Sequence, residues 1–428
     1  MLQSTMNLAL RRAGFSTLED FLSAKAIPAQ QAEMALMPYL VGYELHRVAP
    51  GDTYAKIAPI YQTSVTAIAA ANPRKDPENL QIGTILIVPL GFPLVTEDTA
   101  LTSELLHYVI RGLEARYPSL ISMTIGTTAY GRLLPLLRVG DGPRIVYYNA
   151  SHHANEYITT PLVMGILEQY LKSAAFGEPL MGLDIGSLME HTTLLLAPMV
   201  NPDGVDLVLG AVTETELAAA QAIAQGYPEI PFPAGWKANL RGVDLNLNYP
   251  AQWDEARRIK FEQGFETPAP RDYVGPAPLS ENESRAMFDT TEEISPDLTI
   301  SWHTQGKEIY WKFLDLAPQG AEYLGRQMAA ASGYQLSEIP YASSFAGYKD
   351  WFIQNFDRPG YTIEAGEGDN PLPLSQLPEM YRNNLPIFLL GLTGGLTETE
   401  AAPIQEALAP KQSPQVPQKG LHPVPSWG

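Results

Sequence analysis

The sequence predicts an α/β domain that follows a small βααβ module. Four short apolar runs alternate with helical stretches between residues 101 and 396, namely RIVYYNA (144–150), TTLLLAPMV (192–200), DLTISWH (297–303) and GYTIEAG (360–366). Buried strands interleaved with helices indicate a mostly parallel sheet with helices packed on it. Upstream, a PGDT turn and two amphipathic helices lie between two predicted strands within residues 43–90.

The composition excludes several classes of protein. The chain has 428 residues, no cysteine and a formal net charge of −19, from 28 Lys and Arg against 47 Asp and Glu. This acidic excess argues against a nucleic-acid partner, which needs a basic surface. Without cysteine there is no disulfide, thiolate metal site or cysteine nucleophile, so His and carboxylates must hold any metal. No run approaches the ~18 consecutive apolar residues of a membrane span.

The two ends of the chain differ from its middle. Within residues 1–42, apolar residues such as Leu8, Phe15 and Phe21 recur at helical spacing, which predicts short helices. Two interpretations stay open for them: a helical N-terminal cap, or the remnant of a peptidoglycan-binding domain, which ALMPYLVGY resembles. Residues 91–100 read as a short linker. Residues 401–428 are rich in proline and poor in large apolar residues, so we expect a disordered tail.

The module at 43–90 has a specific pattern. Tyr54 and Ile57 mark one helix, Val65 and Ile68 mark the next, and the run ILIV at 85–88 predicts a closing strand. This order, with PGDT at its start and LQIGTILIVP at its end, resembles a LysM module over its whole length. LysM modules bind glycans that contain N-acetylglucosamine, such as peptidoglycan, so the resemblance implies a glycan partner.

Candidate metal ligands follow two of the predicted strands. His153 and Glu156 straddle the loop-to-helix junction after strand 144–150, so their side chains can converge on one point. His303 ends the strand at 297–303 and is the natural third ligand. Ligands of open α/β sheets bind at the carboxyl ends of strands. Zinc accepts imidazole nitrogen and carboxylate oxygen, and a catalytic zinc keeps one position open for water.

Glu364 ends another apolar strand, before Ala365-Gly366. A carboxylate at such a position either faces solvent or is placed for catalysis. Beside a metal site it can accept a proton from the attacking water, as a general base must.

Five motifs in order carry a resemblance to a known family: HANE, NPDGV (201–205), GVDLN (242–246), SWHTQG and TIEAG. Over about residues 101–395 they look like the zinc carboxypeptidases of the carboxypeptidase A type. The resemblance implies a mixed eight-stranded sheet between helices in a domain spanning 101–400.

The same resemblance implies a set of functional residues. It implies one zinc ion held by His153, Glu156 and His303, with Glu364 as general base and proton shuttle. His152 competes with its neighbour His153, and the family's His-x-x-Glu spacing favours His153.

The chain departs from the family where the substrate binds. The family's Asn-Arg pair, which holds the C-terminal carboxylate of a peptide, is Asn246-Leu247 here, and leucine cannot bind a carboxylate. An enzyme without this clamp has less reason to require a free C-terminus. The cation that polarises the scissile carbonyl is expected in WKANLRGVDL, where Lys237 and Arg241 are both candidates.

Two further residues resemble substrate-binding positions of the family. Tyr341 lies near the place of the family's mobile tyrosine, one residue further from Asp350-Trp351 than usual. Lys349 matches the position that lines the specificity pocket, where an ammonium would favour an acidic substrate group.

Together these features resemble the γ-D-glutamyl-L-diamino acid endopeptidases, zinc peptidases that cut peptidoglycan stem peptides between γ-D-Glu and meso-diaminopimelate. The alternatives are a broad-specificity zinc carboxypeptidase and a non-catalytic peptidoglycan-binding protein. No signal-peptide h-region is visible at the N-terminus, because Arg11 and Arg12 interrupt it. We expect a bacterial protein in the cytoplasm or a sporulation compartment, with cell-envelope association as the alternative. The oligomeric state stays open.

Overall fold

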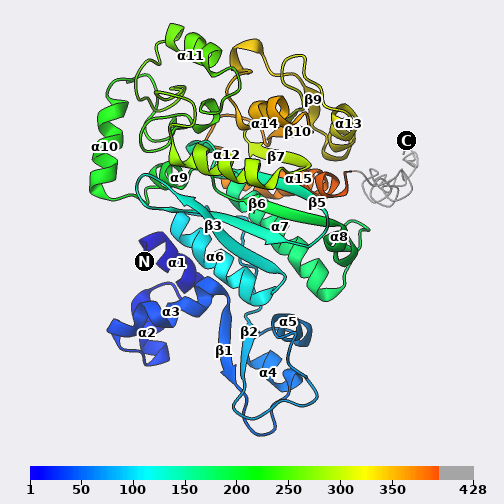
Figure 1. Cartoon of the computed structure of the whole chain (residues 1–428). Helices are drawn as coiled ribbons and strands as arrows, with labels where there is room; N and C mark the ends of the chain where they lie inside the picture. Colours follow the sequence, from blue (N-terminus) through cyan, green and yellow to red (C-terminus); the bar gives the residue numbers. More distant parts are fainter. Residues whose placement is uncertain (395–428) are drawn as a thin grey trace, which may run out of the picture.

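The computed structural model describes residues 1–394, so the predicted tail at 401–428 lies outside the described residues. Most of the chain forms a large domain built on an eight-stranded mixed sheet, and a smaller module with a two-stranded sheet lies beside this domain (Figure 1). The strands are β1 (Tyr43–Arg47), β2 (Ile85–Pro89), β3 (Leu120–Thr127), β4 (Leu133–Val139), β5 (Arg144–Ala150), β6 (Thr192–Ala197), β7 (Leu298–His303), β8 (Glu308–Tyr310), β9 (Gln335–Ser337) and β10 (Gly360–Glu364).

Helices precede, separate and follow these strands. The α-helices are α1 (Gln3–Arg12), α2 (Leu18–Lys25), α3 (Ala32–Val41), α4 (Tyr54–Ile60), α5 (Val65–Ala71), α6 (Ser103–Arg116), α7 (Thr159–Phe176), α8 (Ile185–His191), α9 (Pro202–Val208), α10 (Glu214–Ala224), α11 (Trp253–Glu262), α12 (Asn282–Ile294), α13 (Ala321–Ser332), α14 (Tyr348–Phe356) and α15 (Leu377–Thr393). Short 3-10 turns are η1 (Ala29–Gln31), η2 (Ala154–Glu156), η3 (Leu245–Leu247), η4 (Tyr341–Ser343) and η5 (Leu374–Gln376).

The large sheet has the strand order β3-β4-β6-β5-β7-β10-β8-β9. Its four central strands β6, β5, β7 and β10 are parallel and almost entirely buried, and they correspond to the four apolar runs of the sequence. The predicted α/β class with a mixed eight-stranded sheet is therefore confirmed. The strands β3, β4, β8 and β9 were not singled out by the sequence. They are antiparallel additions or short edge strands, and β3 has no clean apolar alternation.

Helices cover both faces of the sheet (Figure 1). One face packs against α6, α7, α13 and α15 around buried residues such as Leu167, Trp302 and Phe388. The opposite face packs against α11, α12 and α14 around Tyr147 and Trp351. Because helices cover both faces, neither side of the central strands contacts solvent, which explains why these strands are continuous apolar runs in the sequence.

The helices α1–α3 share the core of the large domain. Leu8, Phe21 and Leu40 lie in the same buried cluster as Leu106 and Leu113 of α6. The segment packs against α6, and both interpretations of residues 1–42 stay predictions.

The βααβ module, which follows α3 in the chain, has a small core of its own. The strands β1 and β2 pair antiparallel, with Leu45 opposite Ile87, and α4 and α5 cover them. Thr53 and Ser64 cap these two helices by accepting hydrogen bonds from backbone N–H groups three residues on. The βααβ order is the one predicted from the PGDT turn and the closing strand.

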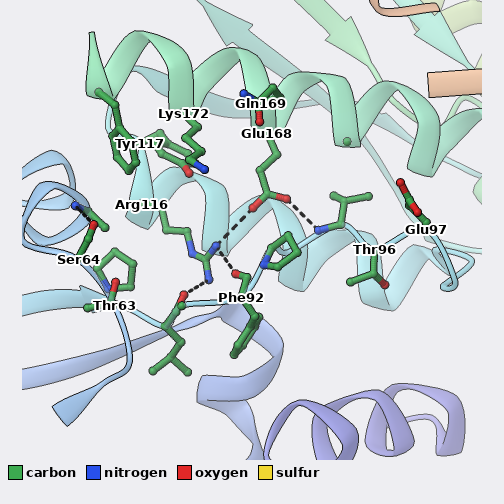
Figure 2. Close-up of a pocket in the computed structure, with 18 of the residues that line it drawn as sticks. Thr63, Ser64, Phe92, Thr96, Glu97, Arg116, Tyr117, Glu168, Gln169 and Lys172 are labelled. Carbon is green, nitrogen blue, oxygen red and sulfur yellow. Dashed lines mark hydrogen bonds and ion pairs between the residues drawn. The ribbon is translucent and has the colours of Figure 1, made fainter. Parts of the chain in front are cut away.

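A buried ion pair fastens this module to the large domain (Figure 2). Arg116 at the end of α6 donates hydrogen bonds to the carbonyls of Gly42, Leu90 and Phe92 at 2.8, 3.0 and 2.9 Å, and lies 3.3 Å from a carboxylate oxygen of Glu168 on α7. Gly42 precedes β1 and Leu90 follows β2, so one guanidinium holds both ends of the module. Glu168 also accepts two backbone N–H groups of residues 94 and 95 at 2.9 Å.

One buried carboxyl group makes the stability of the large domain depend on pH. Glu283 in the first turn of α12 is fully buried, and neither of its carboxylate oxygens has a hydrogen-bond partner among the described residues. Burial, with added repulsion from Asp203 and Glu281, raises the pKa of Glu283 to about 8. The folded protein therefore keeps this group protonated at neutral pH.

We predict that Glu283→Gln removes a pH-dependent loss of stability. Below about pH 4.5 the group is protonated in both states and costs nothing. Between that pH and about 8 only the unfolded chain ionises it, so the free energy of unfolding of the parent protein falls by up to about 1.4 kcal/mol per pH unit. Urea denaturation at pH 5 and pH 8 measures the difference. Glu293→Gln, at an exposed position of the same helix, is the control. Equal pH slopes for parent and Glu283→Gln would contradict the assignment.

Candidate active site

Two candidate metal ligands, His153 and Glu156, follow the end of β5. Ser151 follows the strand with φ at 54°, a left-handed conformation that turns the chain sharply, and its hydroxyl is bonded to Thr159 and Thr160 at the start of α7. His153 then precedes the 3-10 turn η2, which ends at Glu156. The turn brings the two side chains together, with His153 Nδ1 2.9 Å from Glu156 Oε1.

His303 completes a trio from the end of the neighbouring strand. Its Nδ1 lies 2.9 Å from Glu156 Oε2 and 3.2 Å from His153 Nδ1. Ligand atoms of a tetrahedral zinc site are about 3.3 Å apart, given Zn–N and Zn–O bonds of roughly 2.0–2.1 Å. Two imidazole Nδ1 atoms that face each other and a carboxylate at these distances fit a zinc ion. His153, Glu156 and His303 form the one such group that the described residues contain.

The second nitrogen of His153 is held by a carboxylate. Asp244 Oδ1 lies 3.1 Å from His153 Nε2, which leaves Nδ1 to face the metal position. Burial would raise the pKa of Asp244, but the charges of His153 and Lys237 hold it well below its usual value. The sequence analysis did not single out Asp244. Its position in the GVDLN motif, two residues before Asn246, could have identified it as a candidate functional residue.

His152 points elsewhere. Its fully buried ring contacts Tyr249, with Nε2 3.1 Å from the phenol oxygen, and is stacked near the ring of His303. Burial holds the pKa of His152 well below its usual value, so the ring is neutral. The structure therefore places His152 in the core, and His153 in the trio.

Glu364 lies beside the trio because β10 pairs with β7. The register places Glu364 directly opposite His303, and its partly exposed side chain lines the cleft. Burial and the nearby charge of Glu156 raise the pKa of Glu364 to about 8. A carboxyl group with a pKa near neutrality can both take up and release a proton at working pH.

The structure separates the two candidate cations. Lys237 lines the cleft, and its Nζ lies 3.1 Å from Glu156 Oε1. Burial would lower the pKa of Lys237, but the charge of Glu156 outweighs it, so the amine stays charged. Arg241 lies outside the cleft lining, with its half-exposed side chain 3.6 Å from Glu281.

The cleft above the trio has a volume of about 780 Å³. Asn246 and Leu247 line it from the turn η3. Asn246 Oδ1 accepts a hydrogen bond from Tyr348 N at 3.0 Å, and its side-chain NH2 makes no hydrogen bond within residues 1–394. Leu247 thus presents an apolar side chain where the family's arginine would stand.

The last two substrate-binding candidates differ in position. Lys349 lines the cleft but is buried, with Nζ bonded to Asp350 and to the carbonyl of Lys312 at 2.8 Å. Tyr341 is 61% exposed, its hydroxyl bonds Glu255 at 3.1 Å, and it is not part of the cleft lining. The tyrosine that does line the cleft is Tyr310 on β8, which the sequence did not single out.

A basic cluster on the cleft wall was also missed. Lys260 and Arg271 share the carboxylate of Asp272, with N–O distances of 2.6 Å each. Lys260 is in the last turn of α11, and Arg271 and Asp272 lie in the loop that follows it, so no sequence pattern marked them as one cluster.

The sheet, the His-Glu-His trio and the adjacent glutamate define a metallopeptidase. The zinc carboxypeptidase profile matches residues 106–387, and a LysM domain profile matches residues 46–89. The chain belongs to the zinc carboxypeptidase family, whose metal is zinc, and carries a LysM domain at its N-terminal side. It is an enzyme, as the sequence predicted.

Two curated relatives cover most of the catalytic domain. The chain is 42% identical over 283 residues to γ-D-glutamyl-L-diamino acid endopeptidase 1 of Lysinibacillus sphaericus, covering 66% of this chain and 70% of that protein. It is 35% identical over 289 residues to the uncharacterized protein YqgT of Bacillus subtilis, covering 67% and 74%. The carboxypeptidase A of Helicoverpa armigera shares the fold with a TM-score of 0.52, at 16% identity over 92% of this chain and 95% of that one.

We predict that zinc binding requires His303 and does not require His152. Loss of one of three protein ligands should weaken zinc binding by more than the roughly 10- to 100-fold typical of losing only a ligand's hydrogen-bond partner. Metal analysis of His303→Gln after dialysis against a weak chelator should show little zinc. His152→Gln, a matched buried histidine, should keep about one ion per chain. If His303→Gln kept its zinc and His152→Gln lost it, the assignment of His303 as the ligand would be wrong.

Proposed function

We propose that the chain hydrolyses the γ-D-glutamyl–diamino acid bond of bacterial peptidoglycan stem peptides, with meso-diaminopimelate as the diamino acid. The observation that carries the proposal is Leu247, which lines the same cleft as His153 of the trio and Glu364. The cleft has candidate metal ligands and a general base, but an apolar residue replaces the arginine that binds a terminal carboxylate. Such a site is suited to hydrolysing a bond inside a peptide rather than the last one. The match to an enzyme named for this bond supports the choice.

We assign each catalytic residue one task. A zinc ion held by the trio would supply a Lewis acid at the scissile bond. Glu364 takes a proton from the water that attacks the γ-glutamyl carbonyl, and later gives it to the leaving amine. Lys237 stabilises the negative charge that develops on the carbonyl oxygen. Asn246 offers its free side-chain NH2 to the substrate backbone.

The pair Lys349 and Asp350 suits the far end of diaminopimelate. This end carries both an amine and a carboxylate, whereas lysine carries an amine alone. In the structure the ammonium of Lys349 is already bonded to Asp350, so the pocket presents one cation and one anion rather than a lone positive charge. We therefore modify the expectation from sequence: the pair recognises a zwitterion, with Lys349 meeting the carboxylate.

The LysM domain supports a glycan partner of N-acetylglucosamine type, and hence a substrate derived from the cell wall. No helix among residues 1–394 is both long and apolar enough to cross a membrane. A place of action in a bacterial sporulation compartment or the cytoplasm, with free wall fragments as substrate, remains our proposal.

We predict that mass spectrometry will show cleavage after γ-D-Glu in L-Ala-γ-D-Glu-meso-diaminopimelate and in the same stem extended by D-Ala. An ordinary L-peptide should stay intact, because Leu247 cannot hold its terminal carboxylate. Glu364→Gln should lose at least roughly 100-fold in rate, the lower end of general-base contributions, while zinc content is unchanged. Trimming of the ordinary peptide alone would show a conventional carboxypeptidase, and an active Glu364→Gln would refute the role of Glu364.

We also predict that Lys349→Met lowers kcat/KM for diaminopimelate stems by roughly 10-fold or more, the effect of losing one hydrogen bond to a charged group. Stems that end in lysine should be affected less, because they lack the far carboxylate. Lys172→Met, at an exposed position on α7, is the control. Equal kcat/KM values of the parent and Lys349→Met on both stems would remove the basis for this pocket.

A further inference from the structure

Two groups of charged side chains that line the cleft differ in their charge balance. At the start of α14, Lys349 is matched by Asp350, so the pair is neutral. In the second group, Lys260 Nζ and Arg271 Nε lie 2.6 Å from the two oxygens of a single carboxylate, Asp272. These three side chains together carry a formal charge of +1. Nothing in the proposed catalytic cycle uses that charge.

Arg271 is the member of the cluster that can meet a ligand. Its Nε is committed to Asp272, but Nη1 and Nη2 make no hydrogen bond to any described residue. The side chain is 40% exposed and lines the cleft. The paired Nη groups of a guanidinium match the two oxygens of a carboxylate, which a lysine amine cannot do.

The backbone places Arg271 next to Lys237. The carbonyl of Pro270 accepts hydrogen bonds from Lys237 N at 2.8 Å and Ala238 N at 2.9 Å. On the other side of Arg271, the N–H of Asp272 donates to Asp244 Oδ2 at 3.2 Å. Arg271 is therefore anchored to the segment that supplies the oxyanion cation, whereas Lys349 lies on α14.

The proposed substrate has an anion that suits this position. In a γ-D-glutamyl bond the α-carboxylate of the glutamyl residue stays free, four covalent bonds from the scissile carbonyl carbon, or about 5 Å. An ordinary peptide carries a neutral amide there. With the diamino acid beside Lys349, the glutamyl residue lies on the acyl side of the scissile bond, and we place it toward Lys237 and its neighbour Arg271.

We propose that Arg271 binds the free α-carboxylate of the γ-D-glutamyl residue through Nη1 and Nη2, and so selects γ-linked over α-linked substrates. This inference rests on the proposed function and identifies Arg271 as the residue that recognises the substrate on the acyl side of the scissile bond. It also separates two forms of the stem peptide, because amidation of the α-carboxylate to isoglutamine removes the charge that Arg271 would bind.

The test compares two stems that differ in this one group: L-Ala-γ-D-Glu-meso-diaminopimelate and its isoglutamine form. The zinc-loaded parent enzyme should prefer the carboxylate by roughly 10- to 100-fold in kcat/KM, the effect of a hydrogen bond to a charged group. Arg271→Gln should lose most of that preference by slowing only the carboxylate stem, and Arg271→Lys should fall between. Arg326→Gln, an exposed arginine on α13, removes the same charge elsewhere and should leave the preference intact.

The outcomes separate the inference from the proposed function. A parent enzyme that cuts both stems equally well overturns the role of Arg271 and leaves the endopeptidase assignment standing. Equal losses on both stems in Arg271→Gln also overturn it, because they would show a role in holding the loop. If the parent cuts neither stem, the proposed function fails and the inference fails with it. Should Arg271→Gln not fold, the preference of the parent and of Arg271→Lys decides.

Discussion

The parallel pairing of β5, β7 and β10 is the constraint on which the site depends. It brings the ends of three strands, far apart in the sequence, to one edge of the sheet, so that His153, His303 and Glu364 meet there. A slip of one residue between β7 and β10 would turn Glu364 to the other face of the sheet. Because helices bury both faces, such a slip would also expose apolar residues, and the register is strongly specified.

Charges in the cleft are arranged in advance of any substrate. Each buried or half-buried cation is held by a carboxylate, as Lys237 is by Glu156 and Lys349 by Asp350. Groups fixed in this way need little reorganisation when charge develops in the transition state. The exception is the cluster of Lys260, Arg271 and Asp272, in which two cations share one carboxylate, and a substrate anion can bind to the remaining charge.

The N-terminal third of the chain is part of the same folded unit. Arg116 binds the backbone on both sides of the LysM domain, and Glu168 holds the segment that follows it (Figure 2). Gly112 of α6 allows close approach, since a Cβ there would collide with the carbonyl of Val41. A glycan held by the LysM domain would therefore be presented at a defined position relative to the catalytic domain, rather than on a flexible tether.

The sequence by itself determined the α/β class, the LysM domain, and the strand-end positions of His153, Glu156, His303 and Glu364. These features follow from local patterns, because a buried strand is an apolar run and the residue after it lies at the sheet edge. Only the tertiary structure placed Lys237 in the cleft and Arg241 outside its lining, paired Lys349 with Asp350, and placed Tyr341 outside the cleft. It alone revealed Arg271. These side chains lie on loops and helix starts whose positions depend on contacts between distant segments, and no short-range periodicity records such contacts.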